Sequence, residues 1–135
     1  MSDNERPPQL DGELVQQFVI ACHRDVDEVK QFLAQEPRLL NASWDWGGGD
    51  FENGLEGAAH TGQREIALYL IENGARVSLV AAAMLGQLEV VKAIIDANPT
   101  AIESEGAHGI PLMRHALMGG DEAKPVVEFL ESRQI

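Results

Sequence analysis

Cysteine is almost absent from this chain of 135 residues, where Cys22 stands alone. A single thiol forms no internal disulfide, and it excludes the cysteine-rich class of zinc sites. Basic side chains are also scarce: ten Lys and Arg face 22 Asp and Glu, which gives a net charge of −12. Binding to nucleic acid or to an anionic membrane needs a basic face, so this balance argues against both kinds of partner.

The chain also lacks a long apolar run and a basic N-terminal segment. Its longest uninterrupted apolar stretch, residues 79–85, is far shorter than a membrane-spanning helix. The first eight residues have neither the basic start nor the apolar core of a signal peptide. The sequence therefore predicts a cytoplasmic protein, and an apolar share of 44% predicts a folded core.

What the chain does contain is a repeated pattern. Residues 58–67 and 82–91 both read small-small-x-x-Gly-Gln-x-Glu-apolar, and residues 21–30 fit the same frame with Asp25 in place of the glycine. A fourth copy begins at residue 110. The equivalent positions are Cys22, Ala59, Ala83 and Ala116, so the copies are spaced by 37, 24 and 33 residues. Four repeats are therefore predicted.

Each copy predicts a helix, a turn and a second helix. The first helix is rich in alanine, which lets neighbouring helices approach closely, and the second has apolar side chains every three or four residues. These apolar positions are Val26, Val29, Phe32, Leu33, Ile66, Leu70, Ile71, Val90, Val91, Ile94, Ile95, Val126, Val127 and Leu130. One pair cannot bury its own apolar face, so the pairs are expected to stack into a solenoid.

The copies resemble the ankyrin repeat, whose signature is Thr-Pro-Leu-His-x-Ala with a period of about 33 residues. Residues 110–116 carry the Pro-Leu step and the alanine, and residues 62–66 and 86–91 resemble the Gly-His-x-Glu-Val-Val turn. Residues 72–77 resemble the family's x-x-Gly-Ala-Asp-Val exit, with Arg76 where Asp is usual. The resemblance covers about residues 13–132 and is closest to small bacterial stand-alone members.

The resemblance implies an all-α solenoid of about four repeats with irregular or missing β-hairpin fingers. The repeats are expected near residues 13–43, 52–77, 78–105 and 108–135, after a flexible tail over residues 1–12. The spacing of 24 leaves only Val77-Ser78 for the second finger, so the hairpin there is expected to be missing. The first finger, residues 43–53, is long and holds three glycines and both tryptophans, which either contact a partner or pack on a neighbouring repeat.

The resemblance also implies a concave groove lined by the two residues after each alanine pair. These are His23-Arg24, His60-Thr61, Met84-Leu85 and Leu117-Met118. Their four apolar side chains indicate either a partner-binding patch or residues packed beneath a loop. The residues expected to contact a partner are therefore Trp44, Trp46, His60, Met84, Leu85, Leu117 and Met118. No catalytic, cofactor-binding or metal-binding residue is predicted.

The histidines carry no metal-binding motif of the His-Glu-x-x-His kind. His23 and His60 occupy equivalent positions in adjacent copies, so their side chains are expected to lie near each other. In ankyrin repeats a His in the turn of His108 often bonds the backbone of the next finger, and His115 is expected to be half-buried. Cys22 is expected to be buried and inert, and most acidic side chains, Glu52 among them, are expected to be solvated.

Two functions stay open at this point. The prediction is a non-enzymatic module without a cofactor that binds an unknown protein or peptide. The acidity of the chain would favour a basic partner. The alternative is a small-ligand-binding or enzymatic protein with a site around His60, His108 and Gly47–Gly49. A monomer or a weak homodimer is expected. A closed pocket with converging polar groups would favour the alternative, and a shallow open groove would count against it.

Overall fold

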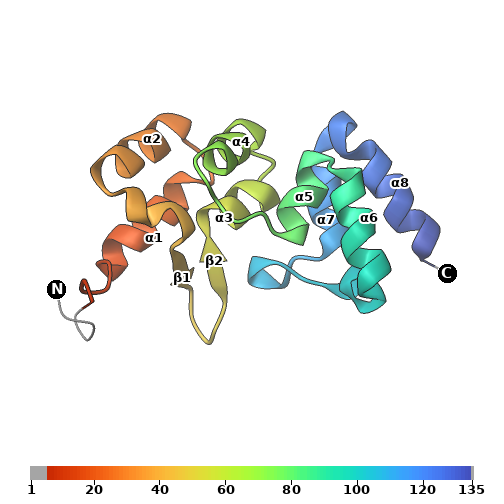
Figure 1. Cartoon of the computed structure of the whole chain (residues 1–135), viewed down its shortest axis with the longest axis horizontal. Helices are drawn as coiled ribbons and strands as arrows, with labels where there is room; N and C mark the ends of the chain where they lie inside the picture. The colour runs from red at the N-terminus through yellow and green to blue at the C-terminus, as the bar shows by residue number, and fades with distance from the viewer. Residues whose placement is uncertain (1–5, 135) are drawn as a thin grey trace.

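The computed structural model describes residues 6–134, which are mostly helical (Figure 1). The α-helices are α1 (Gly12–Ala21), α2 (Val26–Gln35), α3 (Gly54–His60), α4 (Arg64–Glu72), α5 (Leu79–Leu85), α6 (Leu88–Ala97), α7 (Leu112–Met118) and α8 (Lys124–Arg133). The 3-10 turns are η1 (Pro37–Asn41), η2 (Pro99–Glu103), η3 (Ala107–Gly109) and η4 (Gly120–Ala123). Strands β1 (Ser43–Asp45) and β2 (Phe51–Asn53) form a small antiparallel hairpin. The predicted all-α class is therefore confirmed.

The helices follow one another in pairs along the molecule. Each odd-numbered helix packs against the helix that follows it, and α1, α3, α5 and α7 also pack one on the next. Figure 1 shows α1 and α8 at opposite ends of this row, with the β1–β2 hairpin projecting from one side. Residues distant in sequence therefore meet chiefly across neighbouring odd-numbered helices and at the loops beside them.

Polar side chains at the predicted turns fix where the helices begin. Asp25 accepts hydrogen bonds from the backbone of Asp27 and Glu28 at the start of α2. Asn53 and Glu56 form a reciprocal capping box at the start of α3. Such side chains satisfy amide groups that have no partner inside the helix. The strand β2 therefore ends directly in a helix.

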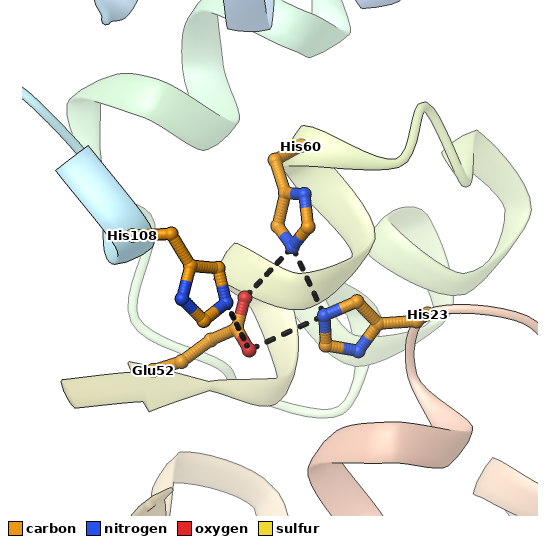
Figure 2. Close-up of side chains that lie close together, drawn as sticks. All are labelled: His23, Glu52, His60 and His108. Carbon is orange, nitrogen blue, oxygen red and sulfur yellow. Dashed lines mark hydrogen bonds and ion pairs between the residues drawn. The ribbon is translucent and has the colours of Figure 1, made fainter. Parts of the chain in front are cut away.

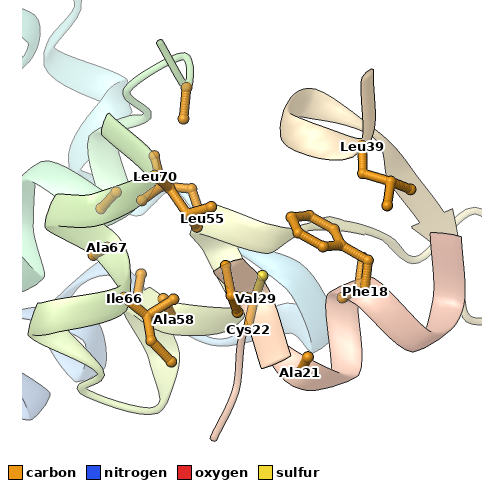
Figure 3. Close-up of a cluster of buried hydrophobic side chains, with 14 of the residues drawn as sticks. Phe18, Ala21, Cys22, Val29, Leu39, Leu55, Ala58, Ile66, Ala67 and Leu70 are labelled. Atoms are coloured by element: carbon orange, nitrogen blue, oxygen red, sulfur yellow. The ribbon is translucent and has the colours of Figure 1, made fainter. Parts of the chain in front are cut away.

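The core consists of two clusters of apolar side chains that share α5. Figure 3 shows the first, in which Phe18 of α1, Val29 of α2, Leu55 of α3 and Leu70 of α4 are buried together. The second is built by Val91, Ile95, Leu112, Val126 and Leu130, among others. Burying a side chain of this size contributes about 1.5–3 kcal/mol. Half of the predicted stripe positions are fully buried, namely Val29, Ile66, Leu70, Val91, Ile95, Val126 and Leu130. The others are partly buried except Val90, which is 40% exposed.

Met84 and Leu85 are buried at the end of α5, with 1% and 3% of their surfaces exposed. The prediction that they contact a partner is wrong in this structure, because η4 packs against α5. A Cβ at Gly86 would collide with the backbone of Glu122 in that turn, so the two segments touch directly. His115 is also buried rather than half-buried, at 1% exposed.

The predicted tail over residues 1–12 falls partly on residues 1–5, which lie outside the described residues. Residues 6–11 have no helix or strand, and Leu10 packs against the first core cluster. None of the helices within residues 6–134 has the length and the apolar character that a membrane span requires.

Candidate metal centre

Three histidines and one glutamate converge on one point beside the hairpin (Figure 2). His23 follows the end of α1, Glu52 lies in the middle of β2, His60 ends α3 and His108 lies in η3. Each residue offers one ligand atom, and these four atoms all lie within 4.8 Å of one another. Residues from four separate elements therefore present nitrogen and oxygen atoms to the same small volume.

The packing of α1 against α3 brings His23 and His60 together. They stand at equivalent ends of the two helices, and their Nε2 atoms are 3.0 Å apart. Gly57 of α3 leaves room for the ring of His23, because a Cβ at position 57 would lie only 2.6 Å from Cε1 of that ring. The expectation that these two side chains lie near each other is confirmed.

His108 contacts the β1–β2 hairpin directly, although the two are distant in sequence. Residues 73–78 link α4 to α5 without a strand. Asp50, next to the hairpin, accepts hydrogen bonds from the backbone N–H and from Nδ1 of His108, both at 2.7 Å. His108 has a φ of 63°, in the left-handed region that few residues other than glycine adopt. Asp50 therefore holds His108 in an uncommon backbone conformation beside the cluster.

The separations between the histidines and Glu52 lie close to those between ligands of one metal ion. Nε2 of His23 lies 3.2 Å from Oε1 of Glu52, and Nε2 of His60 lies 2.9 Å from Oε2. Nε2 of His108 lies 3.4 Å from Oε1. Zinc bonds to nitrogen and oxygen of about 2.0–2.2 Å place tetrahedral ligands about 3.3–3.6 Å apart. Small side-chain movements therefore suffice to receive an ion.

The hydrogen bonds around the cluster leave it rich in lone pairs. Nδ1 of His23 donates to the carbonyl of Val19 at 2.7 Å, and Nδ1 of His108 donates to Asp50. In a neutral ring, Nε2 then carries a lone pair instead of a hydrogen. Both of these nitrogens face Glu52, whose ionised carboxylate only accepts hydrogen bonds. Metal-binding histidines are oriented in this way, with the second ring nitrogen held by a carbonyl or a carboxylate.

Glu52 is fully buried, at 0% exposed, so the expectation that it is solvated is wrong. Nε1 of Trp46 donates to its Oε1 at 2.9 Å. Its Oε2 lies close to His60 but, among the described residues, has no partner with hydrogen-bond geometry. A buried carboxylate oxygen of this kind is costly unless a hydrogen or a cation satisfies it.

Electrostatics keep Glu52 ionised despite its burial. Burial is the largest single influence and raises the pKa of Glu52, but the hydrogen-bonding groups of His23, His60 and Trp46 and the charge of His23 together hold it well below its ordinary value. The pKa of His23 is raised: burial lowers it, and Glu52 together with the Val19 carbonyl raises it by more. The carboxylate therefore attracts positive charge, which either a proton on His23 or a metal ion supplies.

A cavity of about 470 Å³ lies over the cluster and opens to solvent. It is lined by Ile20, His23, Arg24, Trp46, His60 and His108. The three imidazoles are partly exposed to it, while Glu52 lies beneath them. The cluster thus has a buried side and an accessible side.

The structure gathers only some of the residues predicted to form a binding surface. Trp46 and His60 meet at the cluster, together with His108 of the alternative site. Trp44 is partly buried against the first core cluster. Leu117 and Met118 are exposed at the end of α7, at 54% and 36%. Gly47 and Gly49 donate their N–H groups to Asp45 at the tip of the hairpin, and neither belongs to the metal cluster.

From the sequence, His60 and His108 were named only for a partner contact or an alternative ligand site, and no metal-binding residue was predicted. His23, Glu52 and Asp50 were not placed in any site. The shared position of His23 and His60 in the repeat was a usable signal. The short second finger was another, since it brings the first and third fingers together. Compared with known proteins, the chain matches no protein-family model and no curated protein.

Proposed function

We propose that this protein binds a divalent transition-metal ion through His23, Glu52, His60 and His108. One observation carries the proposal: three imidazole nitrogens and a carboxylate oxygen of the buried Glu52 lie within 4.8 Å of one another. Oε2 of Glu52, 2.9 Å from Nε2 of His60, has no hydrogen-bond partner among residues 6–134. A divalent cation satisfies that oxygen and the facing nitrogen lone pairs at the same time. Val19 and Asp50 then orient His23 and His108 through their second ring nitrogens.

The donor set selects the class of metal. Three imidazoles and one carboxylate suit zinc, iron, cobalt or nickel in the divalent state, whereas magnesium and calcium prefer oxygen ligands alone. Zinc tolerates the small, four-ligand arrangement that the measured separations describe. Zn²⁺ is therefore the ion proposed first, with Co²⁺ as its spectroscopic substitute.

The scaffold proposed for this site is a stack of four ankyrin-like repeats. Four successive helix pairs, with odd-numbered helices packed one on the next, support this proposal. The first finger supplies Glu52, the ends of two inner helices supply His23 and His60, and the third loop supplies His108. The role of the repeats is to hold ligands from distant segments in fixed positions.

Metal titration of the purified protein tests the proposal. We expect Zn²⁺ to bind in a ratio of one per chain in calorimetry, and Co²⁺ to give visible absorption bands of a site with nitrogen ligands. Glu52→Gln keeps the size of the side chain but removes its charge, and it should weaken Zn²⁺ binding by about 100-fold or more, since even residues that only orient ligands matter 10–100-fold.

Glu103→Gln is the matched control, because Glu103 is exposed and lies outside the cluster. It should leave the affinity unchanged. If the wild-type protein binds none of these ions, or if Glu52→Gln binds them equally well, the cluster is a buried ion pair of protonated His23 with Glu52 and the proposal fails.

A second proposal keeps the predicted binding of a protein or peptide. It rests on Leu117 and Met118, two neighbouring apolar side chains that are exposed at the end of α7. Exposed apolar groups of this kind are common at partner sites. Crosslinking to host proteins through a photoreactive group at the exposed position 114 should capture a specific partner, and adding Leu117→Ser to that protein should abolish the capture without lowering the melting temperature. Capture that survives the substitution would exclude this surface.

A further inference from the structure

We infer that the bound metal takes a small organic carboxylate as an additional ligand, held between Arg24 and the ring of Trp46. The inference rests on the proposed metal site and names what that site recognises. Three features of the cavity over the cluster support the inference. They are the side on which the protein ligands lie, the charge of the lining residues and the apolar character of the remaining ones.

The protein ligands surround the ion unequally. Glu52 is buried on one side, at 0% exposed, whereas the side chains of His23, His60 and His108 are 21%, 16% and 35% exposed. The same three rings line the cavity of about 470 Å³. An ion among these ligands is therefore reached from the cavity, and a carboxylate would bind there as a fifth ligand, a coordination number to which zinc can expand.

The residues that line the cavity include one arginine and no acid, although the protein as a whole is negative. Arg24 is among the six lining residues, and none of the six is acidic. Its guanidinium is 67% exposed and approaches Glu28 only at 4.0 Å, so it is available to another carboxylate. Guanidinium groups bind carboxylates through two parallel hydrogen bonds. With a divalent ion below and Arg24 above, the cavity favours an anion.

The remaining walls are apolar and one of them is rigid. Ile20 and Trp46 line the cavity. The indole of Trp46 is fixed by its hydrogen bond to Glu52 and lies 5.9 Å from the ring of His108, measured between centroids. The volume is at the lower end of the range for ligand pockets, about 300–1,000 Å³. A compact acid with an apolar body fits these walls better than a phosphate or a sugar acid does.

Benzoate added to the Co²⁺-loaded protein tests the inference, with benzamide as its neutral counterpart. We expect benzoate to shift the visible absorption of Co²⁺ and to change the fluorescence of Trp46, and benzamide to do neither. Arg24→Gln should keep the Co²⁺ affinity and weaken benzoate binding by about tenfold or more, because it removes a charged hydrogen-bond donor. Arg38→Gln is the matched control, because Arg38 pairs with Glu36 away from the cavity. This variant should bind benzoate as tightly as the wild type.

The outcomes separate this inference from the metal site itself. Failure of Co²⁺ to bind overturns the proposed function. Co²⁺ binding with a spectrum that benzoate leaves unchanged, or benzoate binding that Arg24→Gln leaves unchanged, overturns only the carboxylate inference. A peptide with a C-terminal phenylalanine carboxylate provides another arm: if it binds at least tenfold more tightly than benzoate, the carboxylate belongs to a protein partner and the small-molecule inference fails.

Discussion

The Nε2 atoms of His23 and His60 lie 3.0 Å apart although the two residues are separated by 37 positions in the sequence. Their rings meet edge to face, with centroids 4.8 Å apart. Both nitrogens also face the carboxylate of Glu52. Two imidazole nitrogens approach this closely only when a hydrogen or a cation lies between them, which makes the pair a direct probe of what the cluster holds.

Asp50→Asn should weaken metal binding without removing a ligand. Asp50 accepts from Nδ1 of His108 and so fixes the direction of its Nε2. Loss of such an orienting carboxylate lowers metal affinity by about 10–100-fold. Competition with a zinc chelator measures the change, and Asp121→Asn, at an exposed position, is the control. An unchanged affinity for Asp50→Asn would mean that His108 is not a ligand.

Gly57→Ala should separate metal binding from stability. The new Cβ would lie 2.6 Å from Cε1 of His23, so that the ring must move away. Alanine stabilises a helix by roughly 0.5–1 kcal/mol relative to glycine, which offsets part of the cost of moving the ring. We expect the free energy of unfolding to change by about 1 kcal/mol or less, while zinc affinity falls about tenfold or more.

Urea denaturation without metal and calorimetry with zinc give the two quantities. Gly12→Ala is the control, because it adds a methyl group to α1 near Trp44 instead of His23. If Gly57→Ala is natively folded and binds zinc as tightly as the wild type, then the position of His23 does not determine metal binding.

Zinc should slow hydrogen exchange in residues 106–110. This loop is held mainly by a few backbone bonds, such as Gly106 to Ile110, and by the contact of His108 with Asp50. A bond from His108 to a metal must break before the loop opens. A ligand at 100 times its Kd stabilises the bound state by about 2.7 kcal/mol, or about 100-fold in exchange rate. Mass spectrometry should detect the change in the wild type and find none in His108→Ala.

The thiol of Cys22 should not react with a thiol reagent in the folded protein. Cys22 is fully buried, and its Sγ would lie 2.7 Å from a Cβ at position 54, which shows how tightly α1 and α3 pack there. Burial, and to a lesser degree the charge of Glu52, raises the pKa of the thiol. We expect reaction with Ellman's reagent only in urea, at the rate of global unfolding. Rapid labelling in native buffer would show that α1 separates from α3.

The helices were predictable because their signals are local. The apolar spacing around Val29, Leu70 and Val91 and the capping position of Asp25 depend only on residues within a few turns. Helix ends depend on local signals too: α4 and α6 end just before Asn73-Gly74 and Asn98-Pro99, residue pairs that favour the end of a helix. Met84 and Leu85 were misassigned because their burial depends on η4, which is distant in sequence and packs on α5.

The site was only partly predictable because its members come from four elements. The repeat pattern alone indicates that His23 and His60 are neighbours. Glu52 was predicted to be solvated, because the residue type alone does not indicate that the hairpin buries this side chain. The contact of Asp50 with His108 spans 58 positions and follows from the order of the fingers rather than from any motif.

The short link of residues 73–78 between α4 and α5 has a consequence for the loops on either side of it. A longer loop there would occupy the space between the β1–β2 hairpin and η3. It would then separate His108 from Glu52. Without such a loop, the hairpin and η3 contact each other directly through Asp50 and His108. In other arrays of helix pairs, an unusually brief connector flanked by histidines and acids is a place to look for a bound ion.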